Sequence, residues 1–528
     1  MNLVATVLSG APIQFPSISY SSILPEVVFV GAAVLSMLLV AVLGQRDQTY
    51  GYTGLGVAAA LFGGIWSYHL SQNVNARGAY AVVGGSLAVD GFSTFFMILT
   101  SVGVLITLLL AEAYLYKVSH RGPEFVALTL LSATGAMLME SAYDLLVLFI
   151  GLEILSISLY VMVSYTTSRR VSKESAFKYF ILGGFASALF LYGLALVYGS
   201  TGSTNLGNIA AFLSKNTLTS NGVLLAGMVL ILGGLGFKVA VVPFQFWTPD
   251  VYQGAPTSVT GFMSGVVKAA GFAALLRVFY FAFNTLRADW QPVLEIVAIL
   301  TLLVGAVLAV VQSDAKRTLA YSSINHAGFI LLGLYVASAA SIGDSLYYLF
   351  AYTVMSSGTF GAISMIAHLE GRTEGTLSLA DLRGIGRKYP KIALTLAILL
   401  LAQAGAPFTI GFLAKFSVLS SVVEAHHYVI AVIAMVSVVI AAVLYLRVTL
   451  SMYTPLTKDA EIDRVSTDPE ISLGAVAVRV DEDTDLKVDA KVPVAAGLAM
   501  GLSVAMTVGF GLYASPLVQF ASKAFLLR

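Results

Sequence analysis

Four ionisable side chains lie deep inside long apolar runs of this sequence. They are one carboxylate, Glu153, and three amines, Lys238, Lys268 and Lys415. Each lies too far inside its run for the side chain to reach water easily at the end of a helix. An ionisable group at such depth in a membrane helix is costly, and it is a functional candidate by default. One carboxylate combined with several buried amines is typical of proton transfer.

The proton chemistry would depend on a carboxylate next to a lysine. Burial disfavours the charged form of a lysine, and a nearby carboxylate stabilises it. If the carboxylate moves away, the lysine can release its proton. Glu153 is the only carboxylate that the sequence places deep in an apolar run, with Asp144 at the edge of the same run. We therefore expect Glu153 to pair with one of the lysines.

Three further candidates lie nearer the ends of their runs. Lys178 is close enough to one end for its ammonium to reach water, so a relay role and a surface role are both open. His326 is either a proton carrier, because imidazole titrates near neutral pH, or a hydrogen-bonded packing residue. Arg277 lies near the far end of its run, and we expect its long side chain to extend to the membrane surface.

Other chemistry finds no support in the residue types. The sequence has no Cys, which excludes disulfides, thiolate metal sites and Cys-ligated iron–sulfur clusters held by this chain alone. The six His residues form no pair that we can place on facing helices, so haem is not expected. No phosphate-binding loop, dinucleotide fingerprint or HExxH pattern occurs. We therefore expect no cofactor, no metal and no redox centre in this chain.

The elements that must hold the buried charges are membrane helices. Of the 528 residues, 58% are hydrophobic and 11% charged, whereas about a quarter of a soluble domain is charged. This composition excludes a soluble enzyme and a disordered scaffold. The 29 Lys and Arg residues against 28 Asp and Glu leave no net charge that would attract nucleic acid. Long Leu-, Val- and Ala-rich runs favour helices over the short alternating strands of a barrel.

The apolar runs predict an all-α polytopic membrane protein with about fourteen transmembrane helices. No Lys or Arg precedes the first run within Met1 to Ser22, so we predict no cleavable signal peptide. The fourteen runs are 25–43, 53–71, 90–115, 125–139, 143–165, 175–198, 222–247, 256–283, 289–311, 318–338, 344–368, 391–420, 428–453 and 492–515.

The positions of the basic residues give the expected orientation. If the loop with Arg46 is cytoplasmic, 19 of the 29 Lys and Arg residues fall in cytoplasmic loops and 5 in the opposite loops. Such asymmetry is what the positive-inside rule describes. We therefore expect a multi-pass protein of a bacterial inner membrane with both termini on the periplasmic side.

Two of the lysine-bearing runs also contain a helix breaker. Pro243 follows Lys238 in the seventh run, and Pro407 precedes Lys415 in the twelfth. Proline removes a helix hydrogen bond, and interrupted helices in both halves of a chain are the mark of inverted-repeat transporters. An offset of five helices reverses the orientation of the second copy. We expect broken helices 7 and 12 within two inverted five-helix repeats, spans 4–8 and 9–13.

This organisation divides the chain into five parts. The acidic stretch near its end is predicted to be a solvated cytoplasmic loop, in preference to a docking site. The parts are helices 1–3 over 1–115, the first repeat over 116–283, the second repeat over 284–453, the acidic loop over 454–491 and helix 14 over 492–528.

Several strings resemble the antiporter-like membrane subunits of respiratory complex I, the NADH–quinone oxidoreductase. The similarity covers roughly residues 90–453, and within the family it is greatest to the N branch, also called chain 2, in which a lysine occupies the position of Lys415. Multisubunit cation/proton (Na⁺/H⁺) antiporters share much of the pattern and are the alternative. The strings are GLEILSISLYVMVSY, ESAFKYFILGGFASALFLYG, GFKVAVVPFQFWTPDVYQGAPTSVT, KRTLAYSSINHAGF and GAPFTIGFLAKF.

The resemblance implies a proton-translocating subunit whose relay is coupled to quinone reduction in partner subunits. It implies that FMN, iron–sulfur clusters and quinone belong to those partners, which include antiporter-like subunit M and small membrane subunits within the lipid bilayer. In that picture protons enter from the cytoplasm at Lys238 and leave near Lys415. The residues that match the family's proton path are Glu153, Lys238, Lys268 and Lys415, with Lys178 and His326 as tentative additions.

Overall fold

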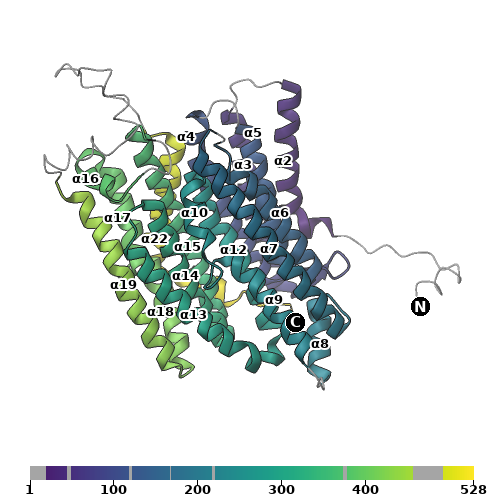
Figure 1. The fold of residues 1–528 in the computed structure, drawn as a ribbon. Coiled ribbons are helices and arrows are strands. Elements are labelled where there is room, and N and C mark those ends of the chain that lie inside the picture. The colour runs from purple at the N-terminus through teal and green to yellow at the C-terminus, as the bar shows by residue number, and fades with distance from the viewer. Residues whose placement is uncertain are drawn as a thin grey trace, which may run out of the picture.

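Long helices lying side by side make up nearly all of the structure (Figure 1). It is a computed structural model that describes residues 19–43, 49–117, 122–166, 168–216, 221–372, 377–455 and 492–527. Most of the stretch before Ser22, and all but two residues of the predicted acidic loop over 454–491, lie outside these ranges. A two-stranded antiparallel sheet pairs β1 (Tyr80–Val82) with β2 (Leu87–Val89).

The helices follow the order of the chain. In the first half they are η1 (Tyr20–Ile23), α2 (Leu24–Leu43), α3 (Thr49–Arg77), α4 (Gly91–Lys117), α5 (Gly122–Ser141), α6 (Leu145–Val163), α7 (Arg170–Thr201), α8 (Leu206–Lys215), α9 (Gly222–Val239), α10 (Trp247–Gly254), α11 (Thr257–Phe262), the π-helix η2 (Met263–Val267), α12 (Lys268–Leu275), the π-helix η3 (Leu276–Ala282) and η4 (Asn284–Leu286). In the second half they are α13 (Arg287–Val310), α14 (Ala315–Val336), α15 (Ala339–Leu369), η5 (Ala380–Leu382), α16 (Ile385–Lys388), α17 (Pro390–Ala404), α18 (Ile410–Glu424), α19 (Tyr428–Tyr453), α22 (Val494–Leu512) and α23 (Ser515–Ser522).

Twelve helices in the described ranges are long and apolar enough to cross a membrane, which confirms the predicted all-α membrane class. They coincide with twelve of the fourteen predicted runs. The other two runs are α3, which is long but more polar, and the twelfth, which is divided into α17 and α18 of 15 residues each. Because ~20 residues are needed to cross a bilayer, neither half of the twelfth run spans alone. The count of fourteen and the inverted repeats remain predictions.

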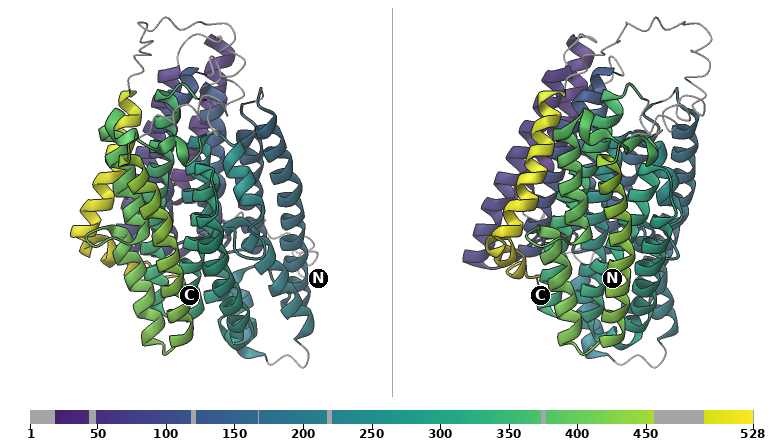
Figure 2. Two further views of the ribbon diagram at one scale, coloured as in Figure 1. Left: turned by 60° about the vertical axis from the view of Figure 1, so that its left-hand side comes forward. Right: turned by 90° about the vertical axis from the view of Figure 1, so that its left-hand side faces the viewer.

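The centre of the bundle is formed by the helices from α11 to η3 together with α14 and α15. Every residue in the apolar parts of α11–η3 and α15 is buried, although these stretches are apolar enough to face lipid. The N-terminal helices lie on one side of this centre and α17 to α19 on the other (Figure 1). The C-terminal α22 runs along the outside, where it packs on α4 and α15 (Figure 2).

Local sequence explains where many of these helices begin. A side-chain oxygen at the position before a helix accepts a hydrogen bond from an N–H of the first turn that the helix itself cannot satisfy. Asp144 caps α6, Asn205 caps α8, Asp314 caps α14 and Thr409 caps α18 in this way. The caps of α6, α14 and α18 fix where these helices begin, and therefore where along the bundle they place Glu153, His326 and Lys415.

Candidate functional site

Lys238 lies in the last turn of α9 and is buried. Its Nζ donates hydrogen bonds to Ser156 Oγ on α6 at 2.8 Å and to the hydroxyl of Tyr179 on α7 at 3.2 Å. The same ammonium lies 5.5 Å from the centre of the Tyr179 ring, a cation–π distance. Three helices therefore converge on one amine whose hydrogen-bond acceptors are neutral hydroxyls.

The helix that carries Lys238 stops immediately after it. α9 ends at Val239, Ala240 adopts a left-handed conformation with φ of 61°, and helix resumes only at Trp247. Pro243 lies in this interruption. The carbonyl oxygen of Phe237, at the end of α9, accepts hydrogen bonds from the Ala240 N–H at 3.1 Å and from the Trp247 indole N–H at 3.0 Å.

Glu153 lies on α6, one turn before Ser156, so the two side chains share a face of the helix. Among the ion pairs of the described residues none joins Glu153 to Lys238, because the amine is bonded to Ser156 and Tyr179 instead. The two charges still interact electrostatically. Glu153 Oε1 is buried without a hydrogen-bond partner in the described part of the chain. The structure thus brings the predicted partners near each other across Ser156 and leaves one oxygen of the carboxylate without a hydrogen-bond donor.

Lys268 begins α12 directly after the π-helical turn η2 and is buried at the centre of the bundle. π-helical turns occur frequently at functional sites. Its Nζ donates to the backbone carbonyl of Ser323 at 2.7 Å and to the Ser323 hydroxyl at 2.5 Å. A Cβ placed on Gly271, one turn after Lys268, would lie 3.5 Å from Cγ of Lys238. The aliphatic part of the Lys238 side chain therefore packs against α12, one turn away from Lys268.

His326 lies between Lys268 and Lys415. Its two ring nitrogens lie 2.8 Å from the hydroxyl of Tyr348 and 3.0 Å from that of Tyr445. The Tyr352 ring lies with its centre 4.8 Å from the imidazole centre and 5.6 Å from Lys268 Nζ. Of the two interpretations that the sequence left open, hydrogen-bonded packing residue and proton carrier, this geometry is compatible with both.

One face of α14 connects the second lysine to the third. Ser323, His326 and Phe329 follow one another at three-residue spacing, which places them along one side of the helix. Ser323 binds Lys268, and the Phe329 ring lies 5.4 Å from Lys415 Nζ. α14 therefore supplies the polar and aromatic groups that occupy the space between the two amines.

Lys415 binds backbone carbonyls at the second helix break. Its Nζ donates to the carbonyl oxygens of Gln403 at 2.7 Å and Ala404 at 3.0 Å. These carbonyls end α17, where they have no intrahelical donor and carry the negative end of the helix dipole. Gly411, in the first turn of α18, allows this approach, because a Cβ there would collide with the Ala402 carbonyl. Pro407 lies in the interruption between the two helices.

Lys178 occupies a different environment. Its side chain is 43% exposed and forms ion pairs with Glu174 and Asp250, both at 2.9 Å. Asp250 also pairs with Arg317 of α14 at 2.6 Å. Lys178 precedes Tyr179 in the chain, but its ammonium is bonded to these carboxylates and not to any group that contacts the buried lysines.

Together, Glu153, Lys238, Lys268, His326 and Lys415 form a row across the bundle. We call it the lysine row. Each of its amines is hydrogen-bonded only to hydroxyl or carbonyl oxygens. An ammonium held by neutral oxygens can lose its proton without leaving a bare carboxylate in the interior, which would be costly. The arrangement therefore places three amines that can bind and release a proton in one part of the bundle.

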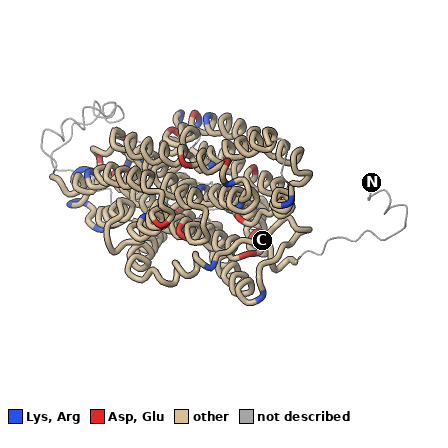
Figure 3. Tube along the Cα trace, turned by 90° about the horizontal axis from the view of Figure 1, so that it is seen from below, with Lys and Arg blue, Asp and Glu red and all other residues tan. Residues whose placement is uncertain are grey.

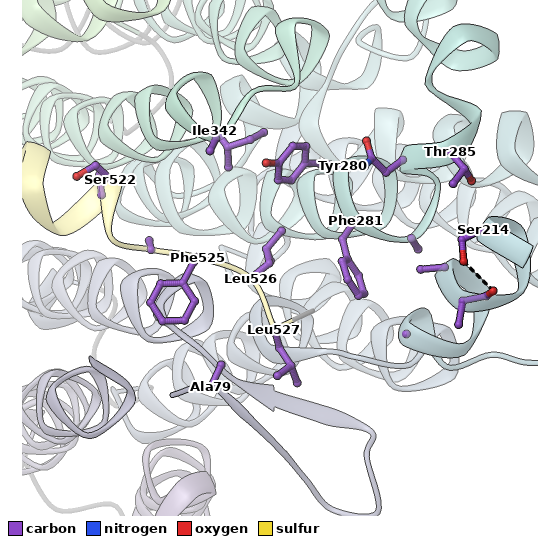
Figure 4. Close-up of a pocket in the computed structure, with 18 residues that line it drawn as sticks. Ala79, Ser214, Tyr280, Phe281, Thr285, Ile342, Ser522, Phe525, Leu526 and Leu527 are labelled. Atoms are coloured by element: carbon purple, nitrogen blue, oxygen red, sulfur yellow. Dashed lines mark hydrogen bonds between the residues drawn. The ribbon is translucent and has the colours of Figure 1, made fainter. Parts of the chain in front are cut away.

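Two kinds of feature could hold a metal ion or a ligand: a cluster of ligating side chains and a cavity. The described residues include no group of three or more His, Cys, Asp or Glu side chains arranged to hold a metal ion. A cavity of about 790 Å³ lies between α8, η3, the start of α15 and the C-terminal stretch. Tyr280, Phe281, Ile342 and Phe525 are among the side chains around it (Figure 4). No member of the lysine row lines this cavity, so it does not belong to the row.

Comparison with known proteins places this geometry in a family. Residues 142–441 match the family model described as NADH:quinone oxidoreductase/Mrp antiporter, TM. NADH-quinone oxidoreductase subunit N of Trichlorobacter lovleyi is 37% identical over 446 residues, which cover 83% of this chain and 88% of the relative. The chain belongs to the NADH-quinone oxidoreductase subunit N family. The corresponding subunit N 1 of Herpetosiphon aurantiacus is 39% identical and covers 81% of this chain and 85% of its own length.

Solved structures agree with this assignment of the fold. A chain of respiratory complex I from Thermus thermophilus, with bound aureothin, has a TM-score of 0.73 and 30% identity, covering 94% of this chain and 99% of that one. A chain of the Mrp complex from Dietzia sp. has a TM-score of 0.79 at 21% identity, covering 96% and 97%. The second similarity concerns the fold alone. The subunit N assignment therefore depends on the sequence relatives.

The structure of this subunit N family member corrects the expectation for Arg277. The side chain does not extend to the membrane surface but is fully buried, and its guanidinium makes a two-pronged contact with Asp90 at 2.7 and 3.0 Å. Asp90 comes directly before α4, and 187 residues separate the pair in the chain. Position near the end of a run gave no signal for burial, because only the tertiary fold covers that end.

Two further carboxylates are buried although the sequence does not place them deep in an apolar run. Glu140 and Glu26 are both buried, near the end of α5 and the start of α2. Each lies at the edge of its apolar run in the sequence, as ordinary interfacial residues do. Seen from below, Lys, Arg, Asp and Glu positions occur within the outline of the bundle as well as along its rim (Figure 3).

Proposed function

We propose that this chain is the proton-translocating membrane subunit N of an NADH–quinone oxidoreductase. The observation that carries the proposal is the lysine row, in which every amine is buried and bonded only to neutral oxygens. Protons would enter at Lys238, pass Lys268 and His326, and leave near Lys415. Movement of Glu153 toward or away from Lys238 would act as a two-state electrostatic switch. Lys178, next to Asp250, would collect protons at the end where they enter.

The redox chemistry belongs to partner chains in this proposal. FMN, iron–sulfur clusters and quinone would be bound by other subunits, and NADH oxidation there would drive the switch at Glu153. The neighbours would be antiporter-like subunit M and the small membrane subunits, in a bacterial inner membrane with both termini on the periplasmic side. The similarity to a chain of respiratory complex I at 30% identity supports a place in such an assembly.

The proposal is tested by Lys238→Ala in the assembled complex. The variant removes the amine that bonds Ser156 and Tyr179, so we expect NADH-driven proton uptake by inverted membrane vesicles to fall about tenfold or more. The complex should still assemble, as judged by native gel electrophoresis. Lys215→Ala, at an exposed position in the last turn of α8, is the control and should pump normally. Normal pumping by Lys238→Ala would remove Lys238 from the path.

The alternative function is a subunit of a cation/proton antiporter, which the matched family model, described as NADH:quinone oxidoreductase/Mrp antiporter, makes worth testing. In that case the same vesicles would show Na⁺-dependent proton movement without NADH, and Lys238→Ala would abolish it. We expect proton uptake to require NADH and to be the same in Na⁺-free and Na⁺-containing buffer.

A further inference from the structure

The face of α15 that lines the second half of the lysine row ends in a carboxylate. Tyr352, Tyr348 and Asp344 follow one another at four-residue spacing, so their side chains share one side of the helix. The Tyr352 ring lies with its centre 5.6 Å from Lys268 Nζ. One turn away, the Tyr348 hydroxyl lies 2.8 Å from His326 Nδ1. The next position on this face, toward the beginning of α15, is Asp344.

Asp344 is also bonded to the helix that carries the last lysine of the row. The Ser421 hydroxyl of α18 donates to Asp344 Oδ2 at 2.5 Å. Ser421 follows Lys415 by six residues, or about 9 Å at helical rise. Ser421 lies near the end of α18 and Asp344 near the start of α15, so their contact is closer to that end of the bundle than Lys415 is. In the proposed orientation this is the periplasmic end.

Tyr348 brings the end of the row close to this carboxylate. The Phe329 ring of α14 stacks on the Tyr348 ring, with the two ring centres 6.1 Å apart. The Phe329 ring centre lies 5.4 Å from Lys415 Nζ. Aromatic side chains in a helix lean toward its N-terminus, so Tyr348 leans toward the turn that carries Asp344. His326 and Lys415 therefore both approach α15 at the turn next to Asp344.

A cavity of about 230 Å³ borders Asp344 between α15, α18 and the C-terminal segment. Ser417 of α18 and Tyr347 of α15 also line it. The Tyr347 hydroxyl is buried and has no hydrogen-bond partner in the described part of the chain, although buried polar groups are nearly always hydrogen-bonded. The cavity is large enough for water molecules, and these three side chains offer the polar partners that buried water requires.

The groups around Asp344 allow it both to gain and to lose a proton. Asp344 is partly buried, and none of the ion pairs in the described ranges includes it. Glu424, at the end of α18, is a second carboxylate within electrostatic range. Burial and this neighbouring charge oppose ionisation, whereas the hydrogen bond from Ser421 stabilises the carboxylate. Neither protonation state is therefore held by a fixed counter-charge.

We propose that Asp344 accepts protons from the end of the lysine row and releases them on the periplasmic side. An N–H bond of the Lys415 ammonium breaks and an O–H bond forms on Asp344, which leaves a neutral amine and a neutral carboxylic acid. The proton crosses between them through hydroxyl groups and water. The acid then gives its proton to water at the end of the bundle and becomes a carboxylate again. This inference rests on the proposed function, because it assigns the group through which the protons leave.

The test compares Asp344→Asn with Asp344→Glu in the assembled complex. Asparagine keeps an acceptor for Ser421 but cannot take up a proton, so we expect NADH-driven proton uptake by inverted vesicles to fall about tenfold. The ratio of the rates in H₂O and D₂O should rise, because proton release becomes the slow step. Asp344→Glu should restore both values. Asp289→Asn, at an exposed carboxylate in the first turn of α13, is the matched control and should pump normally.

Normal pumping by Asp344→Asn would overturn the proposal, and so would slower pumping with an unchanged isotope ratio, which is the mark of a purely structural role. If Asp344→Asn does not assemble, Tyr347→Phe replaces it, because this change removes only a hydroxyl without a partner among the described residues. It should assemble and pump more slowly with a raised isotope ratio, and unchanged values contradict the exit path. Lys238→Ala separates the two proposals. Impaired pumping there, with normal pumping by Asp344→Asn, removes Asp344 alone, whereas normal pumping by Lys238→Ala removes the proposed path itself.

Discussion

At the scale of single residues, the buried amines differ in their neighbours but share the type of acceptor. Lys238 donates to two hydroxyls, Lys268 to one hydroxyl and one carbonyl, and Lys415 to two carbonyls. Hydrogen bonds to a charged group contribute about 1.5–3 kcal/mol each, so these acceptors stabilise the ammonium while leaving it able to deprotonate. A carboxylate at the same contact distance would hold the proton more tightly.

If Lys268 must both carry a charge and release a proton, different substitutions at this position should impair pumping and assembly to different degrees. Lys268→Met removes charge and proton together, and we expect NADH-driven pumping to fall about 10²-fold. Lys268→Arg keeps the charge and the contact with Ser323, so assembly should be better preserved than in the Met variant. Pumping should still be impaired, because a guanidinium does not deprotonate. Proton uptake by inverted vesicles separates the cases, and wild-type pumping by Lys268→Arg would show that Lys268 contributes charge alone.

The candidate residues that the sequence could reveal were those with an unusual local setting. A lysine such as Lys268 in the middle of an apolar run is conspicuous without any knowledge of the fold. Its partners Ser323 and Tyr352 are not, because hydroxyl and aromatic residues are common in membrane helices. The pairing of Asp90 with Arg277 was missed for a different reason. Their contact bridges 187 residues, and each lies where an interfacial charge is ordinary.

At the scale of elements, the two helix breaks place their lysines differently. Lys238 precedes its break and lies in the last turn of α9, whereas Lys415 follows its break and reaches back to the end of α17. In both cases the interruption frees backbone carbonyls in the interior, which a continuous helix would keep bonded. Trp247 uses one of the carbonyls at the first break, and Lys415 uses two at the second.

The hydrogen bonds from Lys415 to the end of α17 should be lost if α18 is pushed away from α17. Gly411→Ala places a Cβ against the Ala402 carbonyl, so α18 must shift and carry Lys415 away from Gln403 and Ala404. We expect a loss of about 1–3 kcal/mol in stability, as for overpacked cores, together with reduced pumping. Gly497→Ala on α22 is the control, since a Cβ there meets nothing within 4 Å. Thermal unfolding of the purified complex and vesicle pumping are the measurements, and unchanged pumping in Gly411→Ala would mean that the Lys415 contact is dispensable.

The sequence predicted elements well where length and composition decide them. Twelve runs become helices that can span a membrane because each combines sufficient length with few charges. The break in the twelfth run was expected from Pro407 and not from composition, which is continuous across 391–420. In the structure Gly405 with φ of 98° ends α17, and Thr409 caps a new helix. The π-helical turns before and after α12 leave no compositional mark, because they depend on packing against neighbouring helices.

At the scale of the whole molecule, one buried ion pair joins segments from the beginning, middle and end of the chain. Asp90, before α4, binds Arg277 of η3, and Asp90 Oδ2 also accepts a hydrogen bond from the Leu527 backbone N–H at 2.9 Å. Arg277 reaches the Glu140 carbonyl at the end of α5. A second hydrogen bond holds the C-terminal stretch against α4: the Phe92 N–H donates to the Phe525 carbonyl at 3.3 Å. The pair therefore ties the N-terminal helices to the central span and to the last described residues.

Breaking this pair should cost far more stability than breaking an exposed one. Asp90→Asn leaves the Arg277 guanidinium buried without a counter-charge, and removing one partner of a buried pair costs about 3–5 kcal/mol. We expect little assembled complex in membranes on a native gel. Lys388→Gln disrupts an exposed pair with Glu370, which should cost less than about 1 kcal/mol and leave assembly normal. The double variant Asp90→Asn/Arg277→Met removes both charges and should recover part of the assembly, because the uncompensated charge is gone. If Asp90→Asn assembles as well as Lys388→Gln, the pair does not hold these segments together.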